Sequence, residues 1–240
     1  MGNQLPYDAT MMPTELERNI SEVDRRIRAA EDAAGRPAGC VSLLAVSKTK
    51  PSELVRQAHG LGLRAFGENY AQEMAEKAAA LADLPISWHF IGPIQSNKTS
   101  VIAEVSDWVH SVDRLKIARR LSEQRPDDRG PLNVLVQVKT SDEDSKSGVQ
   151  PDAVPELVSA IHELPGLTLR GLMTIPAPAT DQALQREPFR QLSALLDRLS
   201  RSQPQLDTLS MGMSGDLEAA VSEGASIVRV GTDIFGARYN

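Results

Sequence analysis

The chain has 240 residues, a length typical of one (β/α)₈ barrel, a fold of about 250 residues. Apolar residues make up 41% of it, charged residues 24% and aromatic residues 4%, which is the composition of a globular protein with an aliphatic core. The net charge of −6 argues against a nucleic-acid binder, because neutralising phosphates requires a clustered excess of Lys and Arg.

Cysteine content and hydropathy exclude further classes. Cys40 is the only cysteine, so no intramolecular disulfide can form, and there are too few thiols for a zinc or redox centre. We therefore expect a reducing, cytoplasmic location. No apolar run approaches the roughly 18 residues that span a bilayer, and the N-terminus has no basic segment followed by an apolar one. Neither membrane insertion nor export is predicted.

The first predicted element is an amphipathic helix that precedes the repeats. Residues 1–12 are predicted to be disordered. Thr14 and Glu17 then form a capping-box pattern. Apolar residues recur at helical spacing until Gly35 and Pro37, namely Leu16, Ile20, Val23, Ile27 and Ala30.

Beyond this helix, short β-branched runs alternate with longer helical patterns. Strands are predicted at 41–47, 64–67, 87–91, 107–111, 133–138, 168–173, 208–210 and 227–230. Helices are predicted at 52–59, 70–81, 114–124, 154–162, 189–201 and 217–223. Eight strands in strict alternation favour a closed α/β TIM barrel over an open doubly wound sheet. No linker divides residues 13–240, so a single domain is expected.

Lys48 stands where such a barrel places its chemistry, directly after the first predicted strand. An amine attacks an aldehyde only when it is uncharged, and partial burial and the neighbouring charge of Lys50 both favour the uncharged form. The alternative is a lysine that pairs with a nearby carboxylate. Both interpretations stay open at this point.

Two segments after the last strands predict a phosphate site. Ser214 and Gly215 follow the seventh strand, and Gly231 and Thr232 follow the eighth. Their backbone N–H groups and hydroxyls can donate to an anion, and phosphate sites recur at this position in the barrel fold. The alternative is that Ser214 caps a helix and Gly231 only allows a turn.

Arg229 alternates with Val228 and Val230, so its guanidinium should point to the opposite side of the strand. A cation inside the barrel needs a partner, either a ligand or a structural salt bridge with a barrel carboxylate. Asn69 either contacts a ligand or caps the following helix, and His89 is more typical of hydrogen-bonded scaffolding.

The acidic stretch 141–148 follows a strand but lacks the His partners or fixed spacing of a metal site. We interpret it as a rim loop in which Lys146 is a candidate anion contact. No metal ligands are predicted.

Taken together, the motifs closely resemble the pyridoxal 5′-phosphate (PLP) homeostasis family, also described as YggS/PROSC-like. The matching segments run in family order: AVSKTKP (45–51), FGENY (66–70), WHFIGPIQSNK (88–98), DSKSG (144–148), RGLM (170–173), LSMGMS (209–214), VRVGT (228–232) and IFGAR (234–238). The resemblance implies the barrel of the alanine racemase N-terminal domain, fold type III among PLP proteins, with an extra N-terminal helix.

The resemblance also implies roles for individual residues. Lys48 would hold PLP as a Schiff base, and Arg229 would face the pyridine nitrogen, keeping it unprotonated and the ring a weak electron sink. The phosphate would lie on Ser214, Gly231 and Thr232, and the ring edge would contact Asn69 and Ser210.

The function implied is that of a non-catalytic PLP carrier, which binds the aldehyde reversibly and passes it to apo-enzymes through transient contacts. The alternative is a PLP-dependent amino-acid racemase. Racemisation needs an acid or base on each face of the substrate, and the sequence, which ends at Asn240, offers no supplier for the second face. A regulatory partner protein is a third interpretation, and a monomer is expected.

Overall fold

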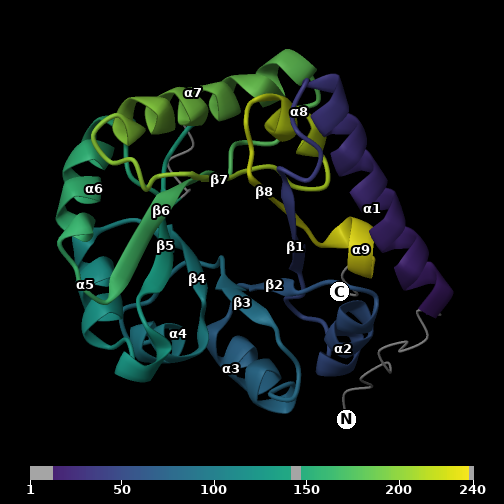
Figure 1. The fold of residues 1–240 in the computed structure, drawn as a ribbon, viewed down its shortest axis with the longest axis horizontal. Coiled ribbons are helices and arrows are strands. Elements are labelled where there is room, and N and C mark those ends of the chain that lie inside the picture. The colour runs from purple at the N-terminus through teal and green to yellow at the C-terminus, as the bar shows by residue number, and fades with distance from the viewer. Residues whose placement is uncertain (1–12, 142–146, 238–240) are drawn as a thin grey trace, which may run out of the picture.

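The computed structural model describes residues 13–141 and 147–237 and shows a closed barrel of eight parallel strands in the order β1 to β8. The helices form an outer ring around the strands (Figure 1). The predicted TIM barrel is therefore confirmed. The predicted disordered segment 1–12 and Lys146 lie outside the described residues. In the part of the chain that is described, no helix is both long enough and apolar enough to cross a membrane.

The elements alternate along the chain. The strands are β1 (Ser42–Val46), β2 (Ala65–Glu68), β3 (Ser87–Phe90), β4 (Trp108–Val112), β5 (Leu132–Gln137), β6 (Leu167–Met173), β7 (Thr208–Ser210) and β8 (Ile227–Val230). The helices are α1 (Pro13–Ala33), α2 (Ser52–Gly60), α3 (Ala71–Ala80), α4 (Thr99–Val105), α5 (Leu115–Glu123), α6 (Val154–His162), α7 (Gln182–Ser200), α8 (Leu217–Ser222) and α9 (Thr232–Phe235).

The predicted strands match the observed ones within about two residues at each end, but one predicted helix starts too late. Helix α7 begins at Gln182 rather than at residue 189. Pro188 lacks an N–H group and normally interrupts a helix, so the sequence pattern predicts a helix only after it. In the structure Pro188 lies inside the helix, whose start is capped by Asp181, which accepts from the Leu184 N–H at 3.0 Å. The short helices α4 and α9 are absent from the predicted ones.

The parallel register brings the predicted binding segments together. Ala45 of β1 lies opposite Val230 of β8 on one side and Phe66 of β2 on the other. The segments that follow these three strands therefore emerge side by side at the carboxyl end of the barrel. Lys48 and Asn69 lie on two of them.

Helix α1 lies on the outside of the barrel against α8 and α9 (Figure 1). Leu16, Val23 and Ile27 on its inner face are buried. These side chains share one stripe of the helix, which explains why the sequence folds here as an amphipathic helix.

A buried carboxylate fixes the end of α1 to the start of the barrel. Glu31 accepts hydrogen bonds from the Val41 N–H at 2.7 Å, the Gly39 N–H at 3.0 Å and Arg28 Nη1 at 2.7 Å. Burial opposes its ionisation, but the donors at Gly39, Arg28 and Val41 outweigh burial and lower the pKa of Glu31 to about 2.

Glu31→Gln is expected to lower the free energy of unfolding by about 2 kcal/mol at neutral pH. Because the folded pKa lies below that of the unfolded chain, the advantage of the wild type is complete above about pH 5 and is lost as the pH falls towards 2. Urea unfolding of both proteins at several pH values measures this. Glu17→Gln, at an exposed position of the same helix, is the control, and a difference that does not vary with pH would contradict the assignment.

Candidate functional site

Six of the predicted binding residues border one cavity of about 280 Å³ at the carboxyl end of the barrel. They are Lys48, Asn69, Ser214, Arg229, Gly231 and Thr232. The cavity is completed by Val46, Ile91, Ile175, Met213 and Gly215. An apolar cavity with a few convergent polar groups is the usual form of a small-molecule site, and its size is near the lower end of the typical range.

Lys48 lies in a tight turn directly after β1 and is half-buried. The Ser47 N–H donates to the carbonyl of Gly67 at 3.0 Å, and the Lys50 N–H donates back to the Ser47 carbonyl at 3.0 Å. Thr49 has a φ of 64°, a left-handed conformation that costs energy for a side chain branched at Cβ. The turn is thus held in a single unfavourable geometry that places Lys48 on the cavity.

A buried cluster beneath this turn holds its conformation. Lys77 Nζ donates to the Ser47 carbonyl at 2.7 Å, to Glu68 Oε1 at 2.7 Å and to Glu73 Oε1 at 2.6 Å. Glu73 Oε1 also accepts from the Thr49 N–H at 2.6 Å, and Glu68 Oε1 accepts from the Ser47 hydroxyl at 2.6 Å. The turn is therefore fixed on both sides of Lys48.

Sequence reasoning missed this cluster. Lys77 lies on the outer helix α3, where a lysine normally reaches solvent, yet it is only 4% exposed. Burial raises the pKa of Glu68, and the nearby charge of Lys77 opposes that rise. The available signals were the spacing of Glu73 and Lys77, one helical turn apart, and a carboxylate at the end of a buried strand.

The 213–216 loop and the 231–233 segment supply another part of the cavity lining, through Met213, Ser214, Gly215, Gly231 and Thr232. Ser214 does not cap the following helix, because the N-cap position belongs to Asp216, whose Oδ1 accepts from the Met213 N–H at 2.6 Å. A Cβ at Gly231 would lie 3.1 Å from the carbonyl oxygen of Val46. A larger residue would have to push the Val46 backbone away by a few tenths of an ångström, so glycine allows the segment to lie close to the Lys48 turn.

Arg229 is buried at the inner wall of the cavity. Its Nη1 donates to Ser210 Oγ at 2.9 Å and its Nη2 to the Thr174 carbonyl at 2.9 Å. Burial lowers the pKa of Arg229 to about 10, while attraction by Asp216 opposes the change. The guanidinium therefore stays charged at neutral pH. Within residues 13–141 and 147–237, Arg229 forms no ion pair with a carboxylate, so the salt-bridge alternative is not observed.

Ser210 is fully buried and lies behind Arg229, outside the lining of the cavity. It ends a chain of side chains inside the barrel. His110 Nδ1 lies 2.8 Å from Ser210 Oγ, His110 Nε2 lies 2.9 Å from His89 Nδ1, and His89 Nε2 lies 3.1 Å from Ser87 Oγ. His89 also stacks on Trp108, with ring centroids 5.6 Å apart. His89 is therefore scaffolding, and His110, which sequence reasoning missed, joins it to Ser210.

Both imidazoles are expected to stay neutral in the folded protein. Burial lowers the pKa of His89 to about 3, and burial together with the nearby His89 and Arg229 lowers the pKa of His110. Their ring ¹⁵N chemical shifts should therefore not change between about pH 7.5 and 5. Below about pH 6.5 each histidine binds a proton in the unfolded chain but not in the folded protein. As the pH falls from about 6.5 to 5, each imidazole should therefore lower the free energy of unfolding by about 2 kcal/mol. Ring shifts that titrate near pH 6.5 would contradict this.

Asn69 offers an unused polar group to the cavity. Its Oδ1 is buried and has no hydrogen-bond partner in the part of the chain that the structure describes. Helix α3 has Tyr70 at its N-cap position without a side-chain cap, so Asn69 does not cap that helix. A buried amide oxygen without a partner is costly in a folded protein, and a ligand that offers it a donor would satisfy it.

No group of three or more potential metal ligands occurs among residues 13–141 and 147–237. The cavity instead combines a primary amine, a permanent cation and two hydroxyls beside glycine backbone, from Lys48, Arg229, Ser214 and Thr232. These groups suit an aromatic aldehyde that carries a phosphate.

Known proteins match almost the whole chain. The family model described as alanine racemase, N-terminal domain, matches residues 19–239. The pyridoxal phosphate homeostasis protein of Pseudomonas aeruginosa is 60% identical over 223 residues, covering 93% of this chain and 96% of that protein. A solved structure of an unknown protein from Bifidobacterium adolescentis has a TM-score of 0.89 at 37% identity and covers 97% of this chain and 98% of that one.

The structure of PipY from Synechococcus elongatus with PLP bound has a TM-score of 0.80 at 34% identity, covering 92% of this chain and 100% of that one. These matches agree with the motifs that the sequence shares with one family. Sequence, fold and cavity position together show that this chain belongs to the pyridoxal phosphate homeostasis protein family, with a barrel of the alanine racemase N-terminal type.

Proposed function

We propose that this protein binds PLP reversibly in the 280 Å³ cavity and holds it for use elsewhere in the cell. The observation that carries the proposal is the meeting of Lys48 with the 213–216 loop and the 231–233 segment around one cavity. A PLP-bound relative of the same fold and the name of the Pseudomonas aeruginosa relative support it.

Each end of the cofactor has a complementary group in the cavity. Lys48 would supply the amine, while Ser214, Gly231 and Thr232 would hold the phosphate. Arg229 would face the ring nitrogen, and the side-chain amide of Asn69, whose oxygen has no partner among the described residues, would contact the ring edge. Ser210 would act on the ring through Arg229, to which it is hydrogen-bonded.

A carrier fits this lining better than an enzyme. Bound PLP supplies an aldehyde with which primary amines condense reversibly, so exchange between amines suffices for capture and release. Arg229 keeps its proton at neutral pH, and a cation facing the ring nitrogen weakens the ring as an electron sink. Among the described residues that line the cavity, Lys48 is the one acid–base group with a proton to exchange, whereas racemisation requires two.

The proposal also includes the cellular setting. A monomer in the cytoplasm would meet apo-enzymes that require PLP and transfer the cofactor during transient contacts. The net charge of −6 and the lone cysteine agree with this setting.

Absorption spectroscopy of the purified protein tests the proposal. Addition of PLP should produce a visible band, borohydride should remove it, and mass mapping should place the reduced adduct on the peptide that contains Lys48. Absence of both band and adduct at saturating PLP would refute PLP binding. Incubation of the PLP-loaded protein with amino acids in D₂O separates the two functions, because a racemase exchanges the α-hydrogen and a carrier does not.

A further inference from the structure

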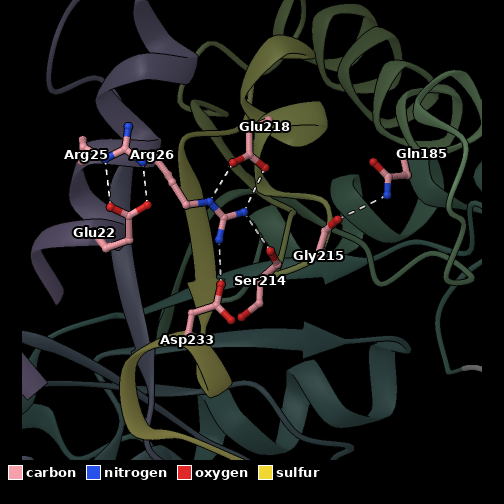
Figure 2. Close-up of polar contacts among 8 residues, drawn as sticks. All are labelled: Glu22, Arg25, Arg26, Gln185, Ser214, Gly215, Glu218 and Asp233. Atoms are coloured by element: carbon pink, nitrogen blue, oxygen red, sulfur yellow. Dashed lines mark hydrogen bonds and ion pairs between the residues drawn. The ribbon is translucent and has the colours of Figure 1, made fainter. Parts of the chain in front are cut away.

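Arg26, on helix α1, contacts both segments that form the proposed phosphate end of the cavity. Its Nη2 donates to the Ser214 carbonyl at 2.9 Å, in the 213–216 loop. Its Nη1 pairs with Asp233 Oδ2 at 2.7 Å, in the 231–233 segment. Figure 2 shows the guanidinium between these groups. One side chain from outside the barrel repeat thus joins two segments that are distant in the sequence.

The same guanidinium makes a bidentate pair with α8. Its Nε donates to Glu218 Oε1 at 2.7 Å and its Nη2 to Glu218 Oε2 at 3.0 Å. The Arg26 side chain is 24% exposed and that of Glu218 49%, so this pair is partly open to solvent and adds little to stability by itself. All three of its nitrogens have partners on α8, α9 or the loop before α8, an arrangement that fixes the guanidinium plane.

Charge gives Arg26 a second effect on an anion. Asp233 and Glu218 stand close to the segments that would carry the phosphate. Without Arg26, two unpaired carboxylates would repel a dianion, and the Ser214 carbonyl would lose the donor that orients its peptide group. The hydrogen bond from Arg26 lowers the pKa of Glu218, as expected for a carboxylate held in its charged form by this pair.

The 213–216 loop is held from the other side as well. Gln185 of α7 donates from Nε2 to the Gly215 carbonyl at 3.2 Å and to the Ala179 carbonyl at 2.8 Å. Figure 2 shows Gln185 and Arg26 on opposite sides of the loop. The loop backbone is therefore held through two successive carbonyls, those of Ser214 and Gly215.

We propose that Arg26 is a positioning residue for the phosphate of PLP, and that phosphate binding and the docking of helix α1 on α8 and α9 stabilise one another. The inference rests on the proposed function. It gives helix α1, which precedes the barrel, a part in cofactor binding. Because linked equilibria are reciprocal, bound phosphate must stabilise the docking of α1 as much as docked α1 stabilises phosphate binding.

The test compares PLP with pyridoxal, which has the same aldehyde and ring but no phosphate. In Arg26→Ala, the affinity for PLP is expected to fall about tenfold, while the affinity for pyridoxal changes less than about twofold. Arg25→Ala is the matched control, because Arg25 is the adjacent residue and pairs with Glu22 of its own helix. It should leave both affinities unchanged. Equal losses for the two aldehydes, or no loss for either, would overturn the inference.

Arg26→Lys serves if the alanine variant does not fold. A lysine keeps the charge but cannot bridge three acceptors, so PLP affinity should fall about threefold with pyridoxal again unchanged. Circular dichroism verifies the fold of each variant before titration. A lysine variant that matches the wild type in its ratio of PLP to pyridoxal affinity would overturn the positioning role.

Hydrogen exchange provides a readout that does not need the aldehyde. Saturating inorganic phosphate should slow amide exchange in α1 and α9 of the wild type and of Arg25→Ala, but not of Arg26→Ala. Unchanged exchange in wild-type α1 would overturn the coupling even if PLP binds. Conversely, a protein that forms no PLP adduct yet shows the phosphate effect refutes the proposed function and leaves the coupling standing.

Discussion

Lys48→Ala is expected to abolish the borohydride-stable adduct with PLP completely. Among the described residues that line the cavity, Lys48 carries the one primary amine, whereas the 213–216 loop, the 231–233 segment and Arg229 remain in place. The variant should therefore still bind PLP non-covalently, with a spectrum that resembles the free aldehyde. Absorption spectra and intact-mass measurement after borohydride give both results.

Lys50→Ala is the control that distinguishes the two neighbouring amines. Burial lowers the pKa of Lys50, so it is the competing nucleophile. Its Nζ, however, donates to the carbonyls of Gly236 and Ala237 at 3.3 and 3.2 Å and does not border the cavity. Lys50→Ala should keep the adduct. An adduct that persists in Lys48→Ala and disappears in Lys50→Ala would show that Lys50, and not Lys48, bonds to the aldehyde.

Lys77→Met is expected to lower the free energy of unfolding by about 3–5 kcal/mol, because it leaves Glu68 buried without its counterion. It also removes the donor to the Ser47 carbonyl, so the Lys48 turn loses support. Urea unfolding measures the loss. The double variant Lys77→Met/Glu68→Gln removes both charges and should recover a large part of the stability, whereas equal losses in the single and double variants would contradict this reasoning.

The loss in Lys77→Met should also depend on pH. Burial raises the pKa of Glu68 above that of the unfolded chain, so the folded protein gains stability from this group as the pH falls through the raised value. In Lys77→Met the charge that opposes this rise is gone, so Glu68 takes up its proton at a higher pH than in the wild type. The difference in the free energy of unfolding between wild type and variant should therefore be smaller near pH 5 than near pH 8. A difference that grows as the pH falls would show that Glu68 is not the group left uncompensated.

The sequence predicts the barrel well because its repeats are local. Each strand and each outer helix has its own period, and a closed parallel barrel then brings the ends of β1, β7 and β8 together without further information. Lys48, Ser214 and Thr232 could be assigned to one site for that reason.

The supports of the site could not be found in the same way, because they depend on tertiary contacts across long stretches of chain. Arg26 and Ser214 are separated by 188 positions, and nothing in the pattern of α1 distinguishes Arg26 from Arg25. In its local pattern Lys77 is typical of a surface residue and His110 of a core residue. Only the packed structure shows which groups they contact.

The hydrogen-bond chain inside the barrel can run in either of two directions. Ser210 Oγ accepts from Arg229 and has one proton of its own to donate. If this proton goes to His110 Nδ1, then His110 and His89 both carry their hydrogen on Nε2, and Ser87 accepts at the far end. If Ser210 instead accepts from His110, every bond reverses and both hydrogens lie on Nδ1. The tautomers of the two imidazoles are therefore coupled: neither ring can move its hydrogen to the other nitrogen unless its neighbour does the same.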